Sequence, residues 1–102
     1  MLNLNPDAKL RDIDFFKFPD GMVDARIENC LFAVGIETVG DLTNPKKELY
    51  LIRNLGMRSL RAIGKQCKEF GIPLQPPYNE LENIKSIDQL KRIQLKIRGQ
   101  DH

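Results

Sequence analysis

The stretch RNLGMRSLRAIGK, residues 53–65, joins a glycine-bearing turn to the start of a strongly patterned helix. After Asn54-Leu55-Gly56, apolar residues and cations recur with helical spacing, so each kind gathers on its own side of the helix. The apolar stripe comprises Leu60, Ile63, Cys67 and Phe70, and the opposite stripe comprises Arg58, Arg61, Lys65 and Lys68. We expect Gly71 to cap this helix, and Pro73 prevents its continuation.

A similar pattern earlier in the sequence predicts a helix from Asp24, with Gly35 placed to end it in a left-handed cap. The spacing puts Arg26 and Asn29, one turn apart, on a side away from the apolar stripe. That stripe consists of Ile27, Cys30, Leu31 and Val34.

Two shorter helices are predicted between these elements. Thr38 and Asp41 have capping-box spacing, which opens a very short helix through Leu42. Asn44-Pro45 matches an N-cap followed by proline at the first helical position, and it predicts a second short helix through Ile52.

The N-terminal residues show no sustained periodicity, but they are rich in aromatic side chains. Phe15, Phe16 and Phe18 stand just before the turn-forming Pro19-Asp20-Gly21. We therefore expect an irregular segment that lies across the helices and is pinned by these rings.

The C-terminal residues follow a stiff Gln75-Pro76-Pro77 exit. Ser86 and Gln89 form another capping box, which opens a helix to about Arg98. The alternation in IQLKI, residues 93–97, leaves a strand open as the other interpretation. A helix of this kind usually folds back on its own domain.

Together these patterns predict an all-α fold: a compact bundle of four short helices that contains a helix-hairpin-helix, with an extra C-terminal helix. The 102 residues are enough for one compact domain and little more. We divide the sequence into an irregular N-terminal segment (1–21), a helical domain (22–74) and a Pro-rich linker with an amphipathic segment (75–102).

The charge of the protein is informative through its distribution. The formal net charge of +2 is too small to indicate a polyanionic partner by itself. Residues 25–74, however, carry eight cations against five acids, and the basic run from Arg53 to Lys68 is not interrupted by an acid. The middle of the sequence is therefore its electropositive part.

Other function classes find little support. Cys30 and Cys67 lack the close Cys/His spacing of a zinc site and are interpreted as buried small hydrophobes, and no cofactor motif is present. The sole histidine is the terminal His102, so we expect no catalytic residues, and an enzyme is the least favoured class. With no signal peptide and no apolar run of spanning length, we expect a reducing, cytoplasmic setting and no membrane.

The turn at residues 54–56 has the layout of a helix-hairpin-helix that binds phosphate. Glycine lets the backbone approach a phosphate closely, and the helix start offers unpaired N–H groups at the positive end of its dipole. Arg58 and Ser59 would supplement these amides. Taken singly, Asn-Leu-Gly before a helix is also typical of an ordinary turn, and a basic stripe is also typical of a solvent-exposed helix face. Their combination with Arg26 and Asn29 favours phosphate binding.

Two segments carry a resemblance to a known family: ARIENCLFAVGIETVGDL at 25–42 and LYLIRNLGMRSLRAIGKQCKEFGIPL at 49–74. Their R-x-x-N-C-L, G-I-x-T-V-G-D-L and R-N-L-G-x-[KR]-S-L blocks resemble the C-terminal domain of the bacterial RNA polymerase alpha subunit. The resemblance covers about residues 22–74. The blocks are specific in combination, because they occur in order with matching spacing.

The resemblance implies a bundle of four short helices that binds the minor groove of A·T-rich promoter DNA. It also implies contacts with RNA polymerase, sigma factor and transcription regulators. By resemblance, Arg26 enters the minor groove and Asn29 is a neighbouring polar contact. The expected contacts with the DNA backbone are Asn54, the Gly56 amide, Arg58 and Ser59, with Arg61 as an added cation.

Departures from the family pattern leave a second interpretation open. Met57 stands where a cation is usual, and Ala62 where an acid is common. The sequence is too short to include the assembly domain of an alpha subunit, so we expect an excised fragment or a free-standing relative. The alternative function is a protein–protein interaction module that keeps the bundle without binding DNA and contacts its partner through the C-terminal helix.

Overall fold

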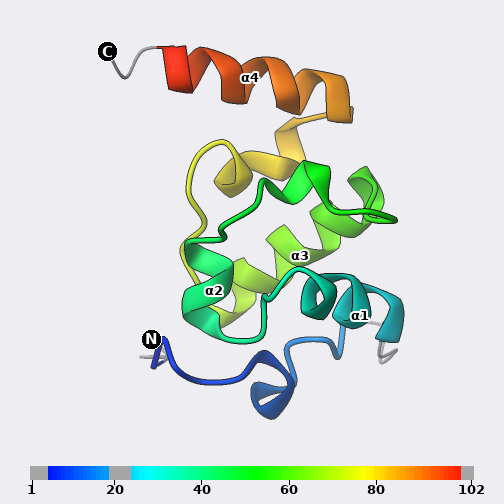
Figure 1. The fold of residues 1–102 in the computed structure, drawn as a ribbon, viewed down its shortest axis with the longest axis vertical. Coiled ribbons are helices and arrows are strands. Elements are labelled where there is room, and N and C mark those ends of the chain that lie inside the picture. The colour runs from blue at the N-terminus through cyan, green and yellow to red at the C-terminus, as the bar shows by residue number, and fades with distance from the viewer. Residues whose placement is uncertain (1–4, 19–23, 100–102) are drawn as a thin grey trace.

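The computed structural model describes residues 5–18 and 24–99, and every regular element in these two ranges is helical (Figure 1). The elements in sequence order are η1 (Leu10–Ile13), α1 (Ala25–Ala33), α2 (Val39–Thr43), η2 (Leu49–Leu51), α3 (Met57–Phe70), η3 (Tyr78–Asn83) and α4 (Ile87–Gly99), where η marks a 3-10 helix. The predicted all-α fold is confirmed. The predicted Pro19-Asp20-Gly21 turn and the terminal His102 lie outside the described residues.

Local signals determine both ends of α1 and the start of α2 as the sequence predicts. The carboxylate of Asp24 accepts hydrogen bonds from the first backbone N–H groups of α1, and Gly35 follows the helix with a left-handed φ of 82°. Thr38 and Asp41 form the predicted capping box at the start of α2. The N–H of Glu37 also donates to Asp41, and this bond holds the pKa of that carboxyl below its ordinary value.

The predicted helix from Pro45 to Ile52 is wrong. Asn44 is the C-cap of α2, with its N–H donating to the carbonyl of Gly40 at 3.0 Å, so it does not begin a helix. Only the 3-10 turn η2 forms further on. Its single turn is enough to bury Leu49 and Ile52, which lie three residues apart and are 1% and 4% exposed.

The N-terminal segment lies against the helices, as its phenylalanines predict. Phe15 is fully buried, and its ring centroid lies 5.7 Å from that of Phe70 at the end of α3. The side-chain amide of Gln66 donates to the carbonyls of Phe15 and Lys17, each at 2.8 Å. These bonds hold irregular backbone in place, because a buried carbonyl without a partner is costly.

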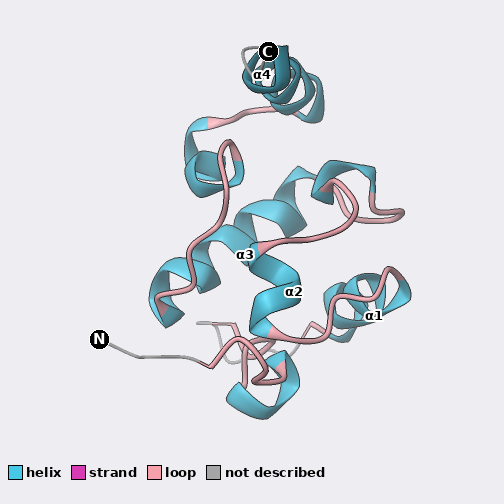
Figure 2. Ribbon diagram, turned by 60° about the vertical axis from the view of Figure 1, so that its left-hand side comes forward, coloured by secondary structure: helices cyan, strands magenta, loops and turns pink. Residues whose placement is uncertain are grey.

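The residues after α3 turn back along that helix and then form α4 (Figure 2). The strand alternative for residues 93–97 is wrong, because these residues belong to α4. Leu90 of α4 is fully buried, and the helix packs against η2, so the predicted fold-back is confirmed. Within the described ranges, no helix combines the length and the apolar character that crossing a membrane requires.

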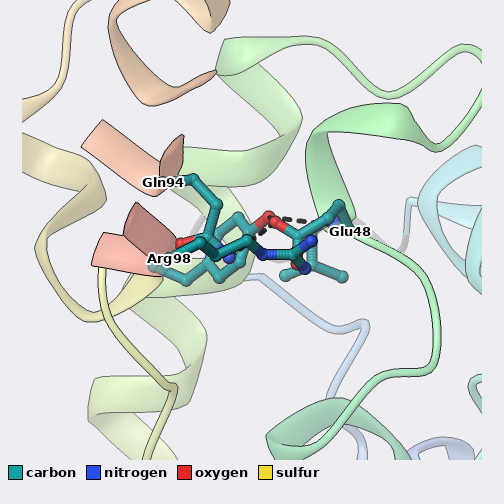
Figure 3. A network of polar contacts seen from close by, with 5 residues as sticks. Glu48, Gln94 and Arg98 are labelled. Carbon is teal, nitrogen blue, oxygen red and sulfur yellow. Dashed lines mark hydrogen bonds and ion pairs between the residues drawn. The ribbon is translucent and has the colours of Figure 1, made fainter. Parts of the chain in front are cut away.

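A polar cluster around Glu48 ties this C-terminal part to η2 (Figure 3). The Glu48 carboxylate accepts hydrogen bonds from the Tyr78 hydroxyl at 3.0 Å, Gln94 Nε2 at 2.7 Å and Arg98 Nη2 at 2.9 Å. The Tyr78 hydroxyl in turn accepts from the N–H of Leu49 at 3.1 Å. One carboxylate therefore joins η2, η3 and α4.

Candidate nucleic-acid interface

The first part of the candidate interface lies on α1. Ile27 and Leu31 are buried, at 2% and 0% exposure, and they turn one face of the helix toward the core. Arg26 and Asn29 are exposed on the remaining surface, three residues and about one helical turn apart. The helical spacing predicted this placement, and the structure confirms that both residues are exposed on α1.

The second part is the turn that leads into α3. Asn54 is exposed and adopts a left-handed φ of 67°, a conformation that asparagine tolerates better than most residues. Gly56 is the N-cap of α3 and has no side chain that could accept from the N–H groups of the first turn. These N–H groups therefore receive no side-chain cap from Gly56, and the exposed Arg58 stands beside them.

The fold itself does not require glycine at position 56. Its φ is −91°, which any residue adopts, and a Cβ built there would meet no atom within 4 Å. The missing side chain therefore leaves open space directly above the start of α3. An external phosphate would use such space, because its oxygens must come within hydrogen-bonding distance of the backbone N–H groups.

The two parts share one side of the molecule. In Figures 1 and 2, α1 and the turn before α3 lie on the same side, and α4 lies at the end of the molecule away from α1. The C-terminal helix therefore does not lie over α1, and Arg26, Gly56 and Arg58 are all exposed.

Two other residues of the predicted contact set have different surroundings. Ser59 is only 6% exposed, so most of this residue is covered by the protein. Arg61 Nη2 donates to the carbonyl of Ile84 at 2.8 Å, so this guanidinium already has a partner within the protein. Whether either residue contacts DNA stays a prediction.

The basic stripe of α3 is divided by the residues that follow the helix. Arg58 at its start is exposed beside the turn, whereas Lys68 near its end pairs with Glu82 of η3. The close packing depends on Gly64, because a Cβ there would lie 3.2 Å from Cδ1 of Leu81. A glycine in the middle of a strong helical pattern was the sequence signal for this approach, and our sequence interpretation missed it.

The two cysteines and the acidic residues do not form a metal centre in the described part of the protein, where no group of three or more candidate ligands gathers. Cys30 is half-buried and Cys67 is buried, and both are free thiols. Burial raises the pKa of the Cys67 thiol to about 12, so it stays protonated and unreactive near neutral pH.

Comparison with known proteins relates the central helical part of the sequence to one protein family. Residues 24–69 match the family described as the C-terminal domain of the alpha subunit of bacterial RNA polymerase. The protein is similar to "DNA-directed RNA polymerase subunit alpha" of Dehalococcoides mccartyi (strain CBDB1), with 39% identity over 67 residues that cover 62% of this sequence and 20% of that protein. No solved structure gives a significant match.

Two further relatives carry the same name. The protein of Rubrobacter xylanophilus is 43% identical over 51 residues, which cover 49% of this sequence and 16% of the relative. That of Treponema pallidum is 33% identical over 69 residues, which cover 67% and 17%. The sequence thus spans only 16–20% of the length of these relatives. The segment from residue 24 to residue 69 belongs to the C-terminal domain family of the bacterial RNA polymerase alpha subunit.

Proposed function

We propose that this protein is a non-catalytic transcription module that binds the minor groove of A·T-rich DNA with Arg26. In this proposal Asn29 lies beside the inserted guanidinium. The Gly56 and Ser59 amides hold a phosphate together with Asn54 and Arg58. The observation that carries the proposal is that the exposed arginine of α1 and the open start of α3 lie on one uncovered side of the molecule.

The physical chemistry of the minor groove suits one exposed arginine. A·T tracts narrow this groove and deepen its negative potential, which a guanidinium detects without reading a base code. Phosphate contacts from the start of α3 would position the domain but add no sequence information. We therefore expect modest preference for A·T over G·C and strong dependence on salt.

The family supports a role beside RNA polymerase. We infer that the domain associates with polymerase, sigma factor or a transcription regulator while its α1–α3 side contacts DNA. Since the sequence spans no more than a fifth of the length of these relatives, the polymerase activity of those proteins is not assigned to it. Its role in this proposal is binding and positioning.

Titration of a labelled A·T-rich duplex, followed by fluorescence anisotropy, tests the proposal. We expect Arg26→Ala to weaken binding by about 1–3 kcal/mol. Lys96→Ala is the matched control, because it removes one exposed charge from α4 at the far end of the molecule. With roughly four phosphates neutralised, the logarithm of affinity should fall with the logarithm of salt at a slope of about −3.6.

Two results would contradict the minor-groove assignment. One is an equal loss of affinity in Arg26→Ala and Lys96→Ala, which would mean that only net charge matters. The other is equal affinity for A·T-rich and G·C-rich duplexes. If the wild-type protein binds neither duplex at low salt, the interaction module without DNA binding is the better interpretation.

A further inference from the structure

A cavity of about 310 Å³ lies between α3 and the residues that follow it. The backbone turns at Gly71 and runs back beside α3 to η3, as Figure 2 shows. Cys67, Ile72 and Leu81 line the cavity and are at most 5% exposed, so its floor is apolar. This volume is at the lower end of the range for ligand pockets, enough for one large apolar side chain.

Cations from α3 form one wall of this cavity. Arg61, Lys65 and Lys68 follow one another at spacings of four and three, so they line up along one face of the helix. Across the cavity stands one acid, Glu82, which pairs with Lys68. Among the described residues Lys65 is in no ion pair, so the wall keeps a surplus of positive charge.

We propose that this groove binds an acidic peptide segment that places one large apolar side chain in the cavity. The three cations extend from Arg61 to Lys68, a rise of seven steps and about 10 Å along α3, which fits a row of carboxylates better than one compact anion. Glu82 already demonstrates that the wall accepts a carboxylate. A nucleic-acid backbone would match the cations but leave the apolar floor unfilled. The proposal is independent of the α1 surface.

The probe is a short peptide of glutamate and serine with one central phenylalanine, titrated at low salt and followed by amide chemical shifts. We expect saturable shifts at Gly64, Lys65 and Leu81. A peptide with serine in place of phenylalanine should bind more weakly, because it leaves the cavity empty. A peptide with glutamine in place of glutamate should bind more weakly too, because it lacks the charges.

Variants with opposite expected effects sharpen the test. Lys65→Glu should weaken binding of the peptide about fivefold, whereas Glu82→Gln should strengthen it about twofold, because it removes the carboxylate that competes for Lys68. Lys96→Glu on α4 is the control with the same change in net charge. Lys65 and Lys96 are both exposed, so neither change disturbs the core.

Several outcomes would overturn the proposal. Two concern the variants: Lys65→Glu and Lys96→Glu weaken peptide binding equally, or Glu82→Gln binds the peptide more weakly than the wild type. Two concern the peptide: it binds equally well with serine in place of phenylalanine, or it causes no saturable shift at Gly64 or Leu81. If an A·T-rich duplex shifts these amides and the peptide does not, the groove belongs to a nucleic-acid surface. Loss of duplex binding in Arg26→Ala does not bear on this result.

Discussion

Replacing Glu48, the N-cap residue of η2, with alanine should loosen the C-terminal part of the molecule. The Glu48 side chain is only 17% exposed and accepts from Tyr78, Gln94 and Arg98 (Figure 3). Tyr78 is 5% exposed and Gln94 is 8% exposed, so water cannot readily replace the lost acceptor. Both donors would be left buried without this partner.

The magnitude follows from these exposures. Each buried donor that loses its partner costs about 1–3 kcal/mol. The Arg98 side chain is 62% exposed, so its ion pair adds only about 0.2–1 kcal/mol. The Tyr78 hydroxyl keeps its bond from the N–H of Leu49, which reduces the loss there. We therefore expect Glu48→Ala to lower the free energy of unfolding by about 3 kcal/mol.

Urea denaturation, followed by far-ultraviolet circular dichroism, measures this loss. Arg98→Ala is the control, because it removes only the exposed pair and should cost less than about 1 kcal/mol. Amide hydrogen exchange should accelerate in α4 of Glu48→Ala and change little in α1. If Glu48→Ala is no less stable than Arg98→Ala, the carboxylate does not hold η2, η3 and α4 together and our reasoning is wrong.

Three other predictions concern buried groups. Burial raises the pKa of the Tyr78 phenol above its ordinary value of 10.0. The stability that the protonated phenol contributes is therefore complete below pH 10.0 and is lost as the pH rises further. Above that pH, the urea midpoint of the wild type should fall more steeply than that of Tyr78→Phe. A thiol reagent at mildly alkaline pH should modify the half-buried Cys30 well before Cys67, whose pKa is about 12, and equal rates would show that Cys67 is accessible. Gly64→Ala should lower the thermal midpoint of unfolding, although alanine has the better helix propensity. The reason is that the new Cβ would lie 3.2 Å from the buried Leu81 side chain. A higher midpoint would mean that Leu81 moves aside easily.

Local chemistry explains which elements were predictable. The starts of α1 and α2 depend on Asp24, Thr38 and Asp41, whose side chains bond to backbone a few residues away. The failed prediction at Asn44-Pro45 shows the limit of such signals, because the same asparagine serves as the end of α2. The single turn at η2 is then stabilised by the hydroxyl of Tyr78, which is 29 residues distant along the sequence.

The candidate site divides in the same way. Helical spacing alone placed Arg26 and Asn29 on the solvent side of α1, because it needed only the period of the helix and the position of its apolar stripe. The partner of Arg61 and the pairing of Lys68 depend on the path of the backbone after α3. The spacing of the cations within α3 does not specify that path.

By itself, the order of residues determined the helical class, the N-caps of α1 and α2 and the side of each helix that carries charge, because these depend on contacts within about one helical turn. Only the tertiary structure decided that η3 covers part of the α3 stripe, that one carboxylate joins three elements, and that α1 and the start of α3 remain open on the same side. These features come from contacts between residues far apart in the sequence. Such contacts depend on how whole elements pack, which no local pattern specifies.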